Sequence, residues 1–208
     1  MIYLRPNPAR VPAPKSARVP APEPARCVAI VGVGVAGCRL VQRHQPSVAA
    51  SPPMPNLRHL AVHTDRDTIT RIQAMPAILL HADASGVAAV MPWLADCKAL
   101  YVLADMGDWP SGGSIATPAL VRLAREAGLH TVALVGMPCV WEGERRNTAA
   151  LHALESLRDC ATETVVVHGD AVAERLGEDA TLDQFVAAFD AALLEELDGR
   201  LATKARLR

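Results

Sequence analysis

The sequence has few aromatic residues and almost no net charge, and these shortages argue against several classes of protein. Only 3% of its 208 residues are Phe, Trp or Tyr, and 21 Lys and Arg stand against 22 Asp and Glu. A nucleic-acid binder normally shows a basic excess, and single-stranded nucleic acid is held on stacked aromatic side chains. We therefore expect no nucleic-acid partner. No apolar run approaches the roughly 18 residues that a membrane span needs.

Patterns for metal binding, disulfide scaffolds and secretion are missing as well. Five cysteines are scattered, at positions 27, 38, 97, 139 and 160, without a C-x-x-C pair, and the seven histidines form no H-E-x-x-H motif. We expect neither a disulfide framework nor a metal site, which favours a reducing compartment. Prolines and arginines interrupt the N-terminus, so it lacks the apolar segment of a secretory signal. The sequence therefore predicts a cytoplasmic protein.

The chain divides into a proline-rich tail and one domain. Residues 1–26 hold seven of the 16 prolines, and the near-copies ARVPAPKS and ARVPAPEP follow each other there. Proline fixes φ and removes a hydrogen-bond donor, so this stretch predicts a disordered or extended tail. The tail is either solvated or a docking peptide for a partner that recognises proline. From Cys27 the sequence becomes apolar, and we expect one domain over 27–203.

Strands and helices alternate through that domain. Short apolar, β-branched runs predict strands at 27–33, 57–63, 77–81, 99–104, 131–135 and 164–168. Longer periodic segments predict helices at 35–44, 64–72, 86–97, 118–127, 144–158 and 182–201. Thr117, as N-cap before Pro118, marks the start of the fourth helix, and Thr181 the start of the last. This alternation predicts an α/β fold, a three-layer Rossmann-like parallel sheet with ligands at the carboxyl ends of its strands.

A glycine-rich turn joins the first strand to its helix. It reads Gly32-Val-Gly34-Val-Ala-Gly37-Cys38, formally G-x-G-x-x-G. Such a turn lets backbone approach a phosphate, which the helix N-terminus then binds. The alternative is a tight turn without a ligand. A dinucleotide-binding reading needs an acid after the second strand, where Asp65 lies 28 residues beyond Gly37, farther than the usual ~20.

Five segments, taken in order over roughly residues 27–200, resemble the FtsZ/tubulin superfamily. They are the glycine turn within IVGVGVAGCRLVQRH, the second-strand segment HLAVHTDRD, the strand and loop at 100–116 with the helix after it, VALVGMPCVWEGERR, and DQFVAAFDAAL. In the fourth, Pro138, Glu142, Gly143 and Arg146 match the family's T-x-P-x-x-x-E-G-x-x-R spacing. In the fifth, Asp190 follows Phe185 by five residues, as the family's guanine-reading Asp does.

The resemblance implies a site for GTP or GDP, with or without Mg²⁺. Phosphates would lie against the two glycine-containing turns, formed by Gly34, Gly37, Cys38 and Arg39, and by Ser111, Gly112, Gly113 and Ser114. Glu142 would accept hydrogen bonds from ribose, Arg146 would bind nucleotide oxygens, and Asp190 would accept from N1–H and N2–H₂ of guanine. Other interpretations stay open: a packed thiol at Cys38, an i,i+4 ion pair between Glu142 and Arg146, and a boundary position for Asp190.

Departures from the family pattern shape the expected function. Ser111 and Ile115 replace glycines of the family's signature loop, and Asp108 adds an acid where phosphates would lie. The residues after Leu201 contain no acid, whereas in the family the catalytic acids follow this helix. The resemblance thus implies a divergent, truncated guanine-nucleotide-binding domain without catalytic residues, cytoskeletal or related to cell division, with hydrolysis weak or absent. It would assemble with itself or another FtsZ-like chain. The alternatives are a degenerate interaction module that binds no nucleotide, and a Rossmann-type NAD(P)-binding protein.

Overall fold

A computed structural model describes residues 27–44, 56–72, 75–81, 83, 85–107 and 113–206, with the backbone alone for 204–206. The proposed tail at 1–26, the loop at 45–55, and Ser111 and Gly112 lie outside the described residues. Within them, the strands are β1 Cys27–Val33, β2 Leu57–His63, β3 Ala77–Leu79, β4 Cys97–Asp105, β5 His130–Met137 and β6 Glu163–His168. They form one parallel sheet in the order β3-β2-β1-β4-β5-β6.

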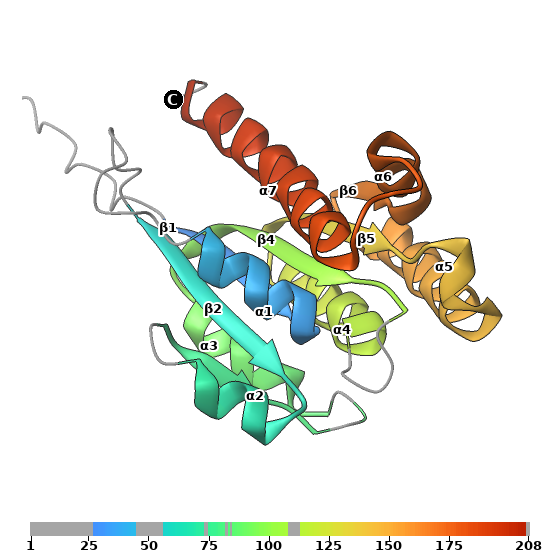
Figure 1. The fold of residues 1–208 in the computed structure, drawn as a ribbon. Coiled ribbons are helices and arrows are strands. Elements are labelled where there is room, and N and C mark those ends of the chain that lie inside the picture. Colours follow the sequence, from blue (N-terminus) through green and yellow to red (C-terminus); the bar gives the residue numbers. More distant parts are fainter. Residues whose placement is uncertain are drawn as a thin grey trace, which may run out of the picture.

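Helices cover both faces of this sheet, so the predicted three-layer α/β fold is confirmed (Figure 1). The α-helices are α1 Gly34–Arg43, α2 Arg66–Arg71, α3 Met91–Leu94, α4 Gly113–Glu126, α5 Glu144–Cys160, α6 Gly169–Leu176 and α7 Leu182–Arg206. Two 3₁₀ turns are η1 Val87–Val90 and η2 Val140–Glu142. One core layer packs α1, α6 and α7 on the sheet, and the other packs η1, α3, α4 and α5. None of the described helices is long and apolar enough to cross a bilayer.

The central strands are buried on both faces, which explains their unbroken apolar runs. Every residue of β1 is buried, since a parallel strand between two helical layers has no solvent-facing side. On α7, Phe189, Leu193, Leu197 and Leu201 are buried at a spacing of four, which places them on one face of the helix. Thr181 caps this helix as predicted, because its hydroxyl accepts a hydrogen bond from the Gln184 amide at 3.3 Å.

Several elements differ from the sequence prediction. Helix α4 begins at Gly113, so Thr117 is a buried residue inside the helix and Pro118 lies within it; the predicted cap at Thr117 is wrong. The helix predicted over 86–97 ends at Leu94, and β4 already starts at Cys97. Helix α6 was not expected, because its eight residues are too few for a clear apolar period.

The expected absence of disulfides is also wrong. Cys27 and Cys97 form one, with their Cα atoms 4.4 Å apart at the start of neighbouring strands β1 and β4. The two residues are 70 positions apart in the sequence, so only the strand order brings them together. Cys38, Cys139 and Cys160 are buried and form no disulfide.

Candidate functional site

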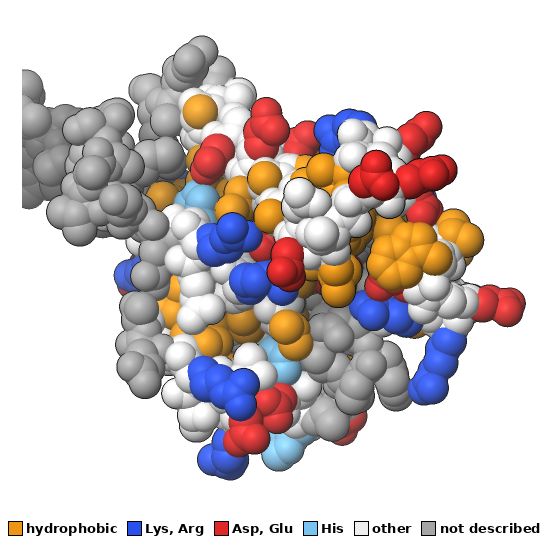
Figure 2. Space-filling model, viewed as in Figure 1, with side chains coloured by type: hydrophobic (Ala, Val, Ile, Leu, Met, Phe, Trp, Pro, Cys, Tyr) orange, Lys and Arg blue, Asp and Glu red, His pale blue; other side chains and the backbone are white. Residues whose placement is uncertain are grey.

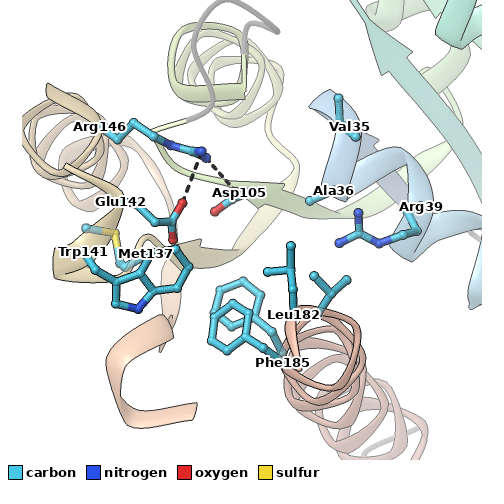
Figure 3. A pocket seen from close by; sticks show the side chains of 12 residues that line it. Val35, Ala36, Arg39, Asp105, Met137, Trp141, Glu142, Arg146, Leu182 and Phe185 are labelled. Atoms are coloured by element: carbon cyan, nitrogen blue, oxygen red, sulfur yellow. Dashed lines mark ion pairs between the residues drawn. The ribbon is translucent and has the colours of Figure 1, made fainter. Parts of the chain in front are cut away.

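A pocket of about 310 Å³ opens at the carboxyl edge of the sheet. The ends of β1, β4 and β5 lie side by side there, because Val33 pairs with Ala104 and Asp105 with Gly136. Its apolar lining consists of Val35, Ala36, Met137, Trp141, Leu182, Phe185, Val186 and Phe189. Its charged lining consists of Arg39, Asp105, Glu142 and Arg146 (Figure 3). Doubly wound sheets bind ligands at this edge.

The glycine turn brings α1 close to the strands beside this pocket. Gly34 has φ 75°, a conformation that favours glycine. A Cβ atom on Gly37 would lie 2.2 Å from the Leu103 carbonyl oxygen, and one on Gly32 would lie 2.0 Å from the Gly37 carbonyl oxygen. The turn therefore permits close helix–strand packing, and that packing places Val35 and Ala36 of the first turn of α1 at the pocket wall.

The two thiols near the site face protein interior. Cys38 is buried, and its Sγ approaches the Val62 carbonyl oxygen at 3.5 Å, which supports the interpretation as a packed thiol. Burial, together with the neighbouring carboxylates of Asp170 and Glu142, raises the pKa of Cys139 to about 11. A thiol with that pKa stays protonated near neutral pH and is a poor nucleophile.

Asp190, the candidate guanine reader, lies behind Arg39 and not on the pocket surface. Its side chain is 0% exposed. Arg39 donates from Nε to Oδ2 and from Nη2 to Oδ1, both at 2.8 Å. Arg43 donates from Nη1 to Oδ2 at 2.7 Å. The carboxylate thus joins α1 to α7 through three charge-assisted hydrogen bonds, and this explains why a buried acid is tolerated.

Glu142 and Arg146 do come together, with a third residue that the sequence did not indicate. Arg146 approaches Glu142 at 3.2 Å as an i,i+4 pair, and Asp105 at 3.7 Å from the end of β4. The second oxygen of Glu142 accepts a hydrogen bond from the Cys139 amide at 2.8 Å. Glu142 is therefore both a pocket residue and a structural cap of η2. The cluster of Glu142, Arg146 and Asp105 lies across the pocket from Arg39 (Figure 3).

Aromatic side chains form one wall of the pocket, a feature that was not predicted from the sequence. The rings of Trp141 and Phe185 meet edge to face with their centroids 6.1 Å apart, and the ring of Phe185 stacks on that of Phe189 with the centroids 5.7 Å apart. These are three of only seven aromatic residues in the chain. The sequence did carry a signal for this wall, because both Phe residues fall within one predicted helix and a Trp adjoins Glu142.

The remaining predicted residues contribute less. Ser114, in the first turn of α4, accepts a hydrogen bond from the Gly107 amide at 2.6 Å, and neither it nor Gly113 lines the pocket. Asp65, which the dinucleotide alternative needs, caps α2 by accepting from the Thr68 amide at 2.7 Å. That bond and the Thr68 hydroxyl lower the pKa of Asp65. Over the part of the chain that the structure describes, no three His, Cys, Asp or Glu side chains cluster as metal ligands would.

The strand order and the pocket at the carboxyl edge define a doubly wound α/β ligand-binding fold. The chain is 28% identical over 190 residues to the cell division protein FtsZ 1 of Halobacterium salinarum, covering 83% of this chain and 46% of the relative. It is 26% identical over 126 residues to the cell division protein FtsZ of Aquifex aeolicus, covering 61% and 34%. No family model matches the chain.

Solved structures agree with these relatives in fold. An FtsZ dimer from M. jannaschii matches with a TM-score of 0.71 at 20% identity, over 84% of this chain and 54% of that one. CetZ from Methanosaeta thermophila matches with a TM-score of 0.65 at 13% identity, over 85% and 54%. These comparisons agree with the predicted resemblance: the chain is similar to FtsZ proteins in sequence and to FtsZ and CetZ in fold. It spans about half the length or less of the curated relatives it matches.

Proposed function

We propose that the pocket binds a guanine nucleotide, GTP or GDP, and that the protein serves a cytoskeletal or cell-division role in the cytoplasm. The observation that carries this proposal is the concentration of three aromatic rings and two arginines in one pocket beside the glycine turn. Relatives support it: the curated ones are named cell division proteins, and a structurally similar CetZ1 from Haloferax volcanii is described as a GDP-bound monomer. A partner would be a second copy or another FtsZ-like chain.

Different pocket residues would contact the base, the ribose and the phosphates of the nucleotide. Phe185 and Trp141 offer faces on which a base stacks, an interaction worth about 1–3 kcal/mol. Glu142 offers a carboxylate oxygen to ribose hydroxyls, and Arg146 a guanidinium to nucleotide oxygens. Phosphates would lie at the start of α1, where Gly34 and Gly37 form the glycine turn. Asp190 has the acceptor chemistry to select guanine, once Arg39 gives way.

Hydrolysis of GTP is expected to be weak or absent, and we assign no catalytic residue. Both acids that line the pocket, Asp105 and Glu142, pair with Arg146. Glu142 also accepts from a backbone amide, so it is committed to holding η2. A general base has to reach and orient a water, an effect worth 10²-fold or more, and neither acid is set up to do so. Phosphate release by purified protein at roughly 1 s⁻¹ or above would contradict this proposal.

The test of nucleotide binding is a melting panel with GTP, GDP, ATP, NAD and NADP, each with and without Mg²⁺. Guanine nucleotides are expected to stabilise the protein by about 2.7 kcal/mol at 100 times Kd. Phe185→Ala should weaken this effect, because it removes the stacking wall. Leu151→Ala, an exposed position on α5 away from the pocket, is the matched control and should change nothing. Stabilisation by NAD or NADP alone would favour the dinucleotide alternative.

A second candidate, an interaction module without nucleotide, is favoured by apolar side chains around the pocket mouth. Trp141 is 65% exposed, and Leu182 and Val35 are also exposed. Figure 2 shows hydrophobic side chains reaching the surface near the N-terminal end of α7. Large exposed apolar groups gathered in one place mark interaction sites. If no nucleotide stabilises the protein, sedimentation should show self-association that Trp141→Ser abolishes.

A further inference from the structure

The contact between Arg39 and Asp190 has an unusual position for an ion pair. Arg39 lines the pocket with 38% of its side chain exposed, whereas Asp190 behind it is 0% exposed. The guanidinium therefore separates the carboxylate from the pocket. Two of its N–H groups, on Nε and Nη2, point at the two oxygens of Asp190 with equal distances of 2.8 Å.

This pair of donors has the same chemistry as one edge of guanine. In guanine, N1–H and the N2 amino group are attached to a common carbon and point the same way. In arginine, Nε–H and an Nη amino group are attached to a common carbon and also point the same way. Both groups are planar and both present two parallel donors to a carboxylate. Adenine has no such edge.

We infer that Arg39 is an internal substitute for the guanine base: it occupies the acceptor that guanine needs, and a guanine nucleotide has to displace it to bind. This inference rests on the proposed function, because it concerns selectivity at the same pocket. It makes Arg39 a residue that determines specificity by competition. The observed affinity is then the intrinsic affinity reduced by the fraction of molecules in which Arg39 is away from Asp190.

The surroundings allow that displacement. Arg39 lines the pocket and is partly exposed, so its guanidinium has water to move into. When Arg39 leaves, Asp190 keeps a cationic partner, because Arg43 donates from Nη1 to its Oδ2 at 2.7 Å. Arg43 does not line the pocket, so a bound base would not displace it. The hydrogen bond to Asp190 raises the pKa of Arg39, so the group that leaves is a guanidinium cation.

Considering charge alone leads to the opposite expectation for the effect of removing Arg39 on nucleotide affinity. Arg39 is a cation in a pocket proposed to bind an anion, so on charge alone its removal should weaken every nucleotide equally. Competition predicts instead that removing Arg39 strengthens guanine nucleotides and leaves adenine nucleotides unimproved. The two accounts differ in sign, which makes the inference testable by affinity alone.

The experiment is isothermal titration of full-length protein with GDP and ADP, for wild type, Arg39→Gln, Arg39→Ala and Arg43→Gln. We expect both Arg39 variants to bind GDP about tenfold more tightly than wild type, a change of ~1.4 kcal/mol. The ratio of ADP to GDP dissociation constants should rise by a similar factor. Arg43→Gln is the matched control, because it also removes a charge and a donor to Asp190 but leaves the Arg39 fork, and it should not tighten GDP binding.

A second measurement follows Arg39 in the wild-type protein, with the Arg39→Gln variant used only for assignment. The Nε–H resonance of Arg39 in wild-type protein, assigned by its loss in Arg39→Gln, should shift on addition of GDP and stay in place on addition of ADP. Tighter GDP binding by the Arg39 variants together with this shift would support the inference.

The outcomes separate the inference from the function on which it rests. If wild type binds GDP and both Arg39 variants bind it more weakly, the nucleotide site stands and the competition is refuted. Equal gains for GDP and ADP would also refute it, since Arg39 would then obstruct the pocket without imitating guanine. If GDP and ADP bind to none of the proteins at millimolar concentration, the proposed function itself fails.

Discussion

Replacing Gly37 by Ala should destabilise the protein, although the same change in most helices stabilises. Gly37 lies in the first turns of α1, where the helix crosses β4. A Cβ atom there would lie 2.2 Å from the Leu103 carbonyl oxygen and 3.0 Å from the carbonyl carbon of Gly32. Both neighbours are backbone atoms, so no side-chain rotation relieves the contact. The helix itself has to move away from the strand.

The size of the effect follows from that movement. Ordinary van der Waals contact begins near 3.4 Å, so α1 has to shift by about 1.2 Å. Overpacking of this kind costs about 1–3 kcal/mol, and the methyl group meets rigid backbone, which places the cost at the upper end. Better helix propensity returns up to about 1 kcal/mol. We therefore expect a net loss of about 2 kcal/mol in the free energy of unfolding.

Gly199→Ala is the control, because the chemical change is the same and the surroundings differ. Gly199 lies within α7, and a Cβ atom there would meet nothing within 4 Å. This variant should gain about 0.5–1 kcal/mol. Urea denaturation followed by circular dichroism measures both, with the slope m checked to be unchanged. A Gly37→Ala protein as stable as wild type would show that α1 does not pack on β4 as closely as described.

Three further predictions concern titration, cysteines and the N-terminal segment. Burial and neighbouring His44 lower the pKa of His59 from 6.5 to about 4, so between those pH values the unfolded state binds a proton that the folded state does not. The free energy of unfolding should therefore fall by about 1–3 kcal/mol as the pH drops from 6.5 to 4. Urea denaturation at several pH values should show a smaller pH dependence for His59→Gln than for wild type. Thiol titration of denatured protein should find three free thiols before reduction and five after it, and five at the start would disprove the Cys27–Cys97 disulfide. Deletion of residues 1–26, which carry few apolar side chains, should leave the melting temperature nearly unchanged, and a large drop would show that they pack on the domain.

The sheet was predictable because each buried strand is a short apolar run bounded by turn residues. The bounds of β1 and β2 agree with the prediction to the residue. Helix α4 was misjudged at Thr117 because threonine before proline is a strong local cap signal, whereas burial in the core decided its actual role. Local signals locate elements well, and tertiary packing overrides them at the ends.

The site was only partly predictable, for a related reason. Glu142 and Arg146 lie four residues apart on one segment, so their pairing was visible in the sequence. The partnership of Arg39 with Asp190 spans 151 positions, and no local pattern reveals it. The family resemblance implied that Asp190 is the acceptor that reads guanine. Only the fold shows which donor reaches it.

The charge balance of the pocket bears on what holds a nucleotide there. Each of the two arginines that line it is already paired with a carboxylate: Arg39 with Asp190, and Arg146 with Glu142 and Asp105. A phosphate entering the pocket thus exchanges one anionic partner for another, and the net electrostatic gain is small. Affinity then depends on stacking against the aromatic wall and on the hydrogen bonds of the base edge. Neither contribution is an attraction between unpaired charges. The affinity for nucleotide should therefore depend weakly on ionic strength and strongly on the identity of the base.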